Sequence, residues 1–151
     1  MSRFEQAPPA TPSSKLEVRT GDHVPHILLV DDDALLRDAL HKTLVRAGYD
    51  VEDASGGTDA LKAFQRQPRD LVITDIVMAD GEGLDMIRAL RELDAHVKII
   101  AMSGGGFGKS DDYLNLADRF GATTVLAKPF SGPEVLAVVA AVLASSSKKG
   151  G

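Results

Sequence analysis

The chain has 151 residues, enough for one domain with a sizeable hydrophobic core and too few for a second domain of ordinary size. It carries 22 acidic and 17 basic side chains and no cysteine, so it offers no basic field for nucleic acid or anionic lipid and no disulfide or thiolate metal site. The longest apolar run, from Val135 to Ala144, is about half of what a bilayer crossing needs, so we expect no membrane span.

The two ends of the chain differ in composition from the middle. Residues 1–24 are rich in proline and small polar residues and show no apolar periodicity, which predicts a disordered leader. They also lack the apolar core of a signal peptide, which favours a cytoplasmic location. Residues 147–151 are serine, lysine and glycine only, which predicts a flexible tail. We therefore expect one folded domain over residues 25–146.

Within this domain, short apolar runs alternate with segments of helical spacing. The predicted strands are 26–31, 51–54, 70–75, 97–103 and 123–128, and the predicted helices are 34–48, 57–67, 83–94, 110–121 and 132–145. Three of the strands are continuous enough in apolar residues to be buried on both faces, whereas 51–54 is the weakest prediction. Five β-then-α units predict an α/β fold with a doubly wound, five-stranded parallel sheet, right-handed crossovers and helices on both faces.

Several residues mark the ends of the predicted helices. Asp33 stands where an N-cap is expected, before the helix that begins at residue 34. Gly48 and Gly121 are placed as C-terminal stops, and Pro133 lies near a helix start.

Chemically useful side chains follow the predicted strands. Asp31 and Asp32 follow the first strand, Asp75 ends the third, Ser103 ends the fourth and Lys128 follows the fifth. Parallel strands bring their carboxyl ends to one edge of the sheet, where such folds bind ligands. Two carboxylates about 4 Å apart repel by roughly 4 kcal/mol at an effective dielectric near 20. Because one lysine leaves the cluster negative, we expect an oxygen-only site for Mg²⁺, or Mn²⁺.

Such a site has the parts needed for phosphoryl transfer, which depends mostly on positioning and charge neutralisation. Asp75 could attack a phosphorus atom and become an acyl phosphate. The cation and Lys128 would offset the charge on the phosphoryl oxygens, and Ser103 could donate a hydrogen bond to one of them.

Four segments resemble the receiver domain of two-component response regulators. They are "ILLVDDD" for its acidic pair, "DLVITDIVMADGEGLDMI" for its phosphoacceptor segment, "IIAMSGGG" for its strand-4 hydroxyl and "VLAKPF" for its Lys-Pro. The likeness covers about residues 25–146, and the four motifs together are specific, although "VDDD" alone would be weak. The resemblance implies a flavodoxin-like, CheY-like fold with strand order 2-1-3-4-5.

The resemblance also implies roles for individual residues. Asp75 would accept a phosphoryl group from a histidine kinase or histidine phosphotransfer protein. Lys128 would contact that group, and Ser103 would move toward it to signal its presence. The implied magnesium ligands are Asp31, Asp32, Asp75 and the backbone carbonyl of Val77. The domain would be a substrate and switch that hydrolyses its own acyl phosphate, and not a turnover enzyme.

The sequence departs from the family at three places. Ala79 stands where proline is usual, so the loop after Asp75 is less rigid, although its glycines remain. Val125 occupies the position of the usual aromatic switch residue, so the common relay from hydroxyl to aromatic ring cannot operate in its usual form. The Gly-rich loop that follows Ser103 carries Phe107, and we hypothesise that Phe107 changes exposure on phosphorylation.

We expect a stand-alone receiver that signals through a protein partner, with no direct contact to nucleic acid or membrane, and a monomer is favoured over a dimer. Two other functions compete with it. A phosphohydrolase of the haloacid-dehalogenase type also has an aspartate after its first strand, but it requires Thr or Val where this chain has Leu35. A receiver-like adaptor that is never phosphorylated would gain nothing from an intact acidic cluster. The four histidines lack metal-ligand spacing and are expected at the surface.

Overall fold

A computed structural model describes residues 23–76, 83–104 and 121–145. In this part of the chain five strands form one sheet: β1 (His26–Val30), β2 (Asp50–Ala54), β3 (Leu71–Asp75), β4 (Lys98–Ser103) and β5 (Thr124–Ala127). Four helices accompany them: α1 (Ala34–Arg46), α2 (Gly57–Arg66), α3 (Gly83–Leu93) and α5 (Gly132–Ala144). The helix predicted at 110–121 lies almost entirely outside the described residues.

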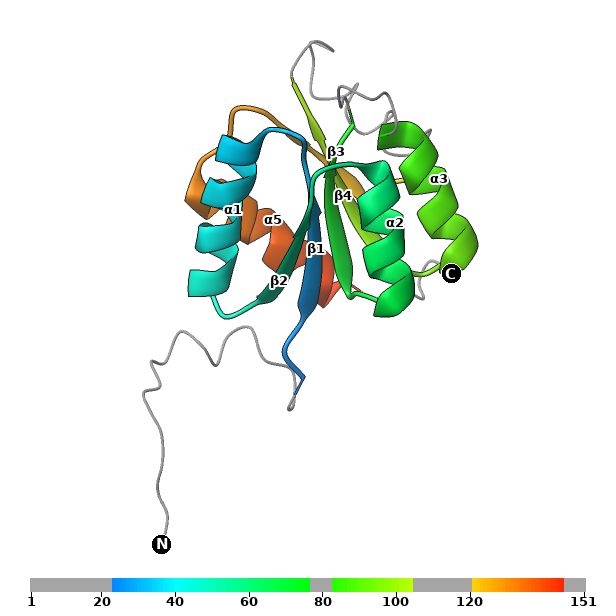
Figure 1. Cartoon of the computed structure of the whole chain (residues 1–151). Coiled ribbons are helices and arrows are strands. Elements are labelled where there is room, and N and C mark those ends of the chain that lie inside the picture. Colours follow the sequence, from blue (N-terminus) through cyan, green and yellow to red (C-terminus); the bar gives the residue numbers. More distant parts are fainter. Residues whose placement is uncertain (1–22, 77–82, 105–120, 146–151) are drawn as a thin grey trace, which may run out of the picture.

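The sheet is parallel throughout and its strand order is β2-β1-β3-β4-β5. This order confirms the doubly wound, flavodoxin-like topology that was predicted. Figure 1 shows the helices in two layers, with α1 and α5 on one face of the sheet and α2 and α3 on the other. Because the strands are all parallel, their carboxyl ends lie along one edge of the sheet, at the top of Figure 1.

The core has two halves, one on each face of the sheet. One half joins inward residues of the sheet to α2 and α3, through side chains such as Phe64 and Ile87. The other joins the opposite face to α1 and α5, through side chains such as Leu44 and Val139. Because β1, β3 and β4 are covered from both sides, almost all of their residues are buried, as their continuous apolar runs predicted.

The predicted boundaries of α1, α2, α3 and α5 agree with the structure to within two residues, while the helix predicted to end at Gly121 lies almost entirely outside the described residues. The Asp33 carboxylate accepts hydrogen bonds from the backbone amides of Leu35 and Leu36, so it is the N-cap of α1. Gly48 and Gly121 have φ values of 104° and 84°, a left-handed conformation that only glycine adopts without strain. Helix α5 begins with a capping box between Ser131 and Glu134, a spacing that is readable in the sequence but was not predicted.

Strand β2 is at the edge of the sheet and differs from the other strands in composition. Its acidic side chains all have cationic or histidine partners: Asp50 contacts His26, Glu52 contacts two arginines, and Asp53 contacts His41 and Arg37. Charged side chains on an edge strand discourage pairing with other chains. Within the described segments, no helix is long and apolar enough to cross a bilayer.

Candidate functional site

Three carboxylates meet at the carboxyl edge of the sheet. Asp31 and Asp32 come from the β1–α1 connection and Asp75 from the last position of β3. One oxygen from each can be chosen so that all three atoms lie within 4.8 Å of one another. The strand order places β1 beside β3, so residues separated by more than forty positions become neighbours.

The innermost carboxylate belongs to Asp31, whose exposed fraction is 0%. Its Oδ1 accepts a hydrogen bond of 2.9 Å from the backbone amide of Asp33. Among the described residues its Oδ2 is buried and has no hydrogen-bond partner. Burial raises the pKa of Asp31, and the nearby Asp75 charge adds to this rise, while the Asp33 amide and Lys128 oppose it. The carboxylate is therefore held in a position that disfavours its charge unless a cation is close.

Lys128 is the cation that the chain itself supplies. Its Nζ donates a hydrogen bond of 3.0 Å to Asp75 Oδ2 and lies 3.5 Å from Asp31 Oδ2. Burial alone would lower the pKa of Lys128, but the hydrogen bond to Asp75 and the charges of both aspartates outweigh it, so the pKa is raised. The ammonium group is therefore charged at neutral pH. The peptide bond between Lys128 and Pro129 is cis.

Ser103 lies at the end of β4, between β3 and β5. Its side chain is completely buried. Its backbone carbonyl accepts a hydrogen bond of 2.7 Å from the Lys128 amide, which ties the start of the Lys-Pro turn to β4. The structure thus brings Asp31, Asp32, Asp75, Ser103 and Lys128 to the same edge of the sheet, as the strand-end positions predicted.

Other predicted site residues are differently placed. Val77, Ala79 and Phe107 lie outside the described residues. Val125 is on β5, partly buried, and packs against the half of the core that contains α2 and α3. It is therefore a packing residue at the position where the family usually has an aromatic ring.

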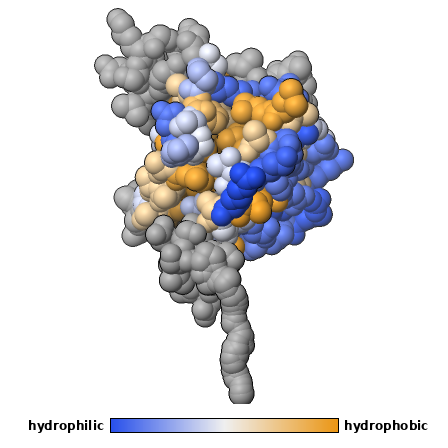
Figure 2. Space-filling view, turned by 90° about the vertical axis from the view of Figure 1, so that its left-hand side faces the viewer, coloured by the Kyte–Doolittle hydropathy of each residue, from blue (hydrophilic) through white to orange (hydrophobic). Residues whose placement is uncertain are grey.

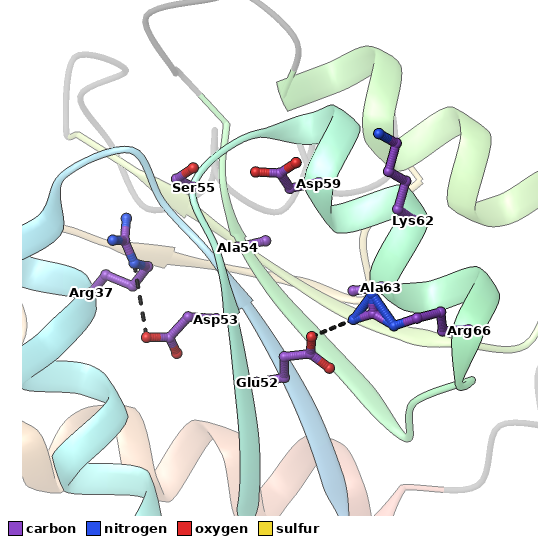
Figure 3. A pocket seen from close by; sticks show the side chains of 9 residues that line it. All are labelled: Arg37, Glu52, Asp53, Ala54, Ser55, Asp59, Lys62, Ala63 and Arg66. Carbon is purple, nitrogen blue, oxygen red and sulfur yellow. Dashed lines mark hydrogen bonds and ion pairs between the residues drawn. The ribbon is translucent and has the colours of Figure 1, made fainter.

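One residue near the site was missed by the sequence analysis. Arg37, the fourth residue of α1, donates a hydrogen bond of 2.6 Å from Nη1 to the backbone carbonyl of Asp31. Helical side chains point back toward the N-terminus of their helix. The sequence could therefore have indicated that an arginine six residues after Asp31 reaches back to that residue. Arg37 also borders a surface pocket of about 390 Å³ between α1, β2 and α2, which Figure 3 shows.

The oxygen-only ligand set suits Mg²⁺, which usually retains several waters and takes one or two carboxylates from a protein. One observation supports a cation site directly. Among the described residues, the buried Oδ2 of Asp31 accepts no hydrogen bond, so it is an oxygen that a cation could bind. Three carboxylates and one ammonium leave a net negative charge, which a divalent cation would offset. The residues present therefore fit a magnesium site.

Comparison with known proteins agrees with this geometry. A sequence profile of the response regulator receiver domain matches residues 27–140. The chemotaxis protein CheY of Halobacterium salinarum is 30% identical over 117 residues, which cover 78% of this chain and 95% of that protein. The probable transcriptional regulator ycf27 of Guillardia theta is 35% identical over 127 residues, which cover 81% of this chain but only 46% of that protein. The chain thus spans about half or less of the transcriptional regulators that it matches.

Solved structures show the same fold. A CheY-like receiver domain protein from Methanospirillum hungatei JF-1 superposes with a TM-score of 0.73 at 25% identity, covering 85% of this chain and all of that one. The chemotaxis protein CheY4 of Vibrio cholerae gives a TM-score of 0.72 at 29% identity, covering 80% of this chain and 99% of the other. With its sheet order, its acidic cluster and the match of more than half its length, this chain belongs to the response regulator receiver domain family of two-component signalling.

Proposed function

We propose that the protein is a phosphorylation switch in which Asp75 accepts a phosphoryl group from a histidine kinase or a histidine phosphotransfer protein. The observation that carries the proposal is the position of Asp75. Its side chain is almost completely buried, lies in a cluster with two other carboxylates and accepts a hydrogen bond from Lys128. Receiver domains are regulators and not turnover enzymes, and an acid held between a lysine and a cation site suits that role.

The transfer requires one bond to form and one to break. An Asp75 oxygen attacks the phosphorus of a phosphohistidine, the P–N bond breaks, and the electron pair returns to the imidazole nitrogen. Lys128 stands beside the attacked position and offsets charge on the phosphoryl oxygens, and Ser103 is placed on the adjacent strand to donate a hydrogen bond to one of them. A magnesium ion held by Asp31, Asp32 and Asp75, with the Val77 carbonyl as a proposed fourth ligand, would supply further charge neutralisation.

Output through a protein partner is supported by the composition of α5. Its only charged residue is Glu134, and its exposed positions include Ala137, Ala140 and Ala141. Figure 2 faces the side of the molecule where α1 and α5 lie in Figure 1, and apolar residues cover much of the left part of that view. We propose that this apolar face contributes to the contact with a downstream protein.

The experiment that tests this function is incubation with a phosphohistidine-containing donor protein and Mg²⁺, followed by intact-mass measurement. We expect one phosphoryl adduct that hydroxylamine removes, as an acyl phosphate should be removed. Asp75→Asn keeps the shape of the side chain but is a poor nucleophile, so it should form no adduct. Asp59→Asn, an exposed carboxylate in the first turn of α2, is the matched control and should be phosphorylated like wild type.

The other outcomes identify the competing functions. No adduct with any donor would contradict the switch and favour a receiver-like adaptor that only binds. Steady release of phosphate from free phosphomonoesters would instead favour a phosphohydrolase. An adduct that persists in Asp75→Asn would place the phosphoacceptor elsewhere.

Three further parts of the proposal rest on the sequence. They are a folded unit at 25–146 between a disordered leader and a flexible tail, a monomer in the cytoplasm, and a role for Phe107 in reporting phosphorylation. The last is checked by amide chemical shifts over residues 104–112, which should change on phosphorylation; unchanged shifts would reject it.

A further inference from the structure

Neighbouring groups form hydrogen bonds with three of the four polar atoms of Asp31. Its backbone amide donates to the Ala54 carbonyl at 3.1 Å, and its Oδ1 accepts from the Asp33 amide at 2.9 Å. Its backbone carbonyl accepts from Arg37 Nη1 at 2.6 Å. In the described part of the chain this leaves Oδ2 as the Asp31 oxygen without a hydrogen bond, 3.5 Å from Lys128 Nζ. The surrounding contacts therefore fix the residue and leave one oxygen for the shared site.

Of the three hydrogen bonds just described, the one to the Asp31 carbonyl comes from a side chain, that of Arg37, which other residues hold in place in turn. Its Nε lies 3.8 Å from Asp53 Oδ2, and Asp53 Oδ1 lies 2.7 Å from His41 Nδ1. Figure 3 shows Arg37 extending from α1 toward Asp53 on β2. Only 21% of the Arg37 side chain is exposed, so its position is more restricted than that of a surface arginine. Edge strand β2 thus supports the site twice, through the Ala54 carbonyl and through Asp53.

We propose that Arg37 is a positioning residue for the divalent cation site: by bonding the Asp31 carbonyl, it keeps Asp31 Oδ2 directed at the cation. Nothing in the family resemblance assigned this role, and the inference rests on the proposed function, which supplies the site. Arg37 acts through the backbone of a ligand residue and does not touch the cation. Groups that orient metal ligands through hydrogen bonds typically change metal affinity by about 10–100-fold.

The direction in which Mg²⁺ affinity changes when Arg37 is replaced distinguishes a positioning role from an effect of its charge. A guanidinium near a cation site repels the cation, so an Arg37 that acted only through its charge would weaken Mg²⁺ binding. Removing such an arginine would tighten binding. A positioning role predicts the opposite, because loss of the hydrogen bond frees the Asp31 carbonyl and disperses the orientations of Oδ2.

The test is a Mg²⁺ titration of the full chain without any phosphodonor, followed through the amide chemical shifts of residues 31–33. Arg37→Met keeps the apolar stem of the side chain and removes its charge and its donors. We expect the dissociation constant for Mg²⁺ to rise about threefold to tenfold, below the usual range because the bond is to the backbone. Arg37→Lys retains the charge but not the planar fork, and it should fall between wild type and Arg37→Met.

Arg46→Met is the matched control, since Arg46 is an exposed arginine in the last turn of the same helix. This variant removes the same charge at the opposite end of α1 from the cation site. It should leave the dissociation constant for Mg²⁺ within about twofold of the wild-type value, because an exposed charge so far away is largely screened. Equal or tighter Mg²⁺ binding by Arg37→Met would overturn the positioning role while the proposed function stands. A wild-type protein that ignores Mg²⁺ would overturn both. Should Arg37→Met not fold, Arg37→Lys decides alone: weaker binding supports the role and unchanged binding overturns it.

Discussion

At the scale of single residues, the two neighbouring aspartates after β1 have different environments. Asp31 is completely buried, whereas Asp32 is exposed. Asp31 continues the pairing of β1 with β2, since its backbone amide donates to the Ala54 carbonyl, whereas Asp32 lies in the bend that follows. The pair therefore combines a buried candidate ligand, whose charge is disfavoured by burial, with a more accessible one.

The burial of the Asp31 carboxylate predicts that removing its charge changes the stability of the metal-free protein. Because its pKa is raised in the folded state, the metal-free protein should lose stability as pH rises from about 4 through that pKa. Asp31→Asn removes the buried charge, so without divalent cations at pH 7 it should be more stable than wild type, on the order of 1 kcal/mol. Urea unfolding in the presence of a chelator measures the difference.

The same measurement contains its own checks. The gain from Asp31→Asn should shrink near pH 4, because the raised pKa leaves the wild-type carboxyl group more protonated there than at pH 7. Asp32→Asn should change stability far less because that side chain is exposed. A destabilised Asp31→Asn at neutral pH, without metal, would show that its ion pair with Lys128 outweighs the burial of its charge.

At the scale of elements, the start of α3 is packed directly against the end of β3. A Cβ atom added to Gly83 would lie 2.1 Å from the Ile76 carbonyl oxygen and 2.9 Å from that of Asp75. Backbone atoms cannot move aside cheaply, so Gly83→Ala should destabilise the protein by about 2–3 kcal/mol. The displaced peptide follows Asp75, so phosphorylation should slow as well. Chemical unfolding and phosphorylation rates measure the two effects.

Gly132 offers a matched control for this substitution. It is the first residue of α5, as Gly83 is of α3, but its added Cβ would meet Thr43 Cγ2 at 3.6 Å, an ordinary contact. Gly132→Ala should leave stability within about 0.5 kcal/mol. Equal effects of the two substitutions would show that the close approach at Gly83 is not what requires glycine.

Strand β2 has three acidic residues and two apolar ones, and its acidic side chains are ion-paired. Glu52 contacts both Arg66 and the buried Arg69, and hydrogen bonds from these arginines lower the pKa of its carboxyl group. A lowered pKa contributes stability above the ordinary value of 4.5, and this contribution disappears as pH falls through the folded pKa.

Replacing Glu52 therefore has a pH-dependent consequence. Glu52→Gln should destabilise the protein at pH 7 by up to about 1 kcal/mol, a modest value because the carboxylate is partly exposed. At about pH 3 the difference from wild type should be smaller than at pH 7, because a larger share of the Glu52 carboxyl group is protonated there. Asp38→Asn, which breaks an exposed i,i+4 pair with Lys42, is the control and should have little effect at either pH. A Glu52→Gln penalty that is constant from pH 3 to 7 would contradict this account.

At the scale of the whole molecule, we expect cation binding and folding to be linked. The three carboxylates come from two segments that only the folded sheet brings together, so Mg²⁺ should bind the native state far better than the unfolded chain. At a free Mg²⁺ concentration of 100 times its dissociation constant, the free energy of unfolding should rise by about 2.7 kcal/mol.

Thermal unfolding with and without a chelator, at matched ionic strength, measures this linkage. Excess chelator should return the wild-type protein to its metal-free stability. A variant with both Asp31→Asn and Asp32→Asn should be equally stable with and without Mg²⁺. A response of that variant as large as that of wild type would show that the cation binds elsewhere.

Much of the fold and of the site could be predicted because the signals are local. Apolar runs mark β1, β3 and β4, helical spacing marks the helices, and in parallel strands the carboxyl ends share one edge, which places Asp75 near Lys128. The weakest prediction, β2, is confirmed as a strand, but its half-buried, acidic sequence carried little signal. Its conformation depends on pairing with β1 and on cations from other elements.

The sequence by itself thus determined the order of the elements, the helix caps and the set of side chains at the strand ends, because each depends on residues close together in the chain. Only the tertiary structure decided which aspartate is buried, where Arg37 binds and why Gly83 has no room for a side chain. Those features depend on distances between segments far apart in the sequence, and packing, not local propensity, sets such distances.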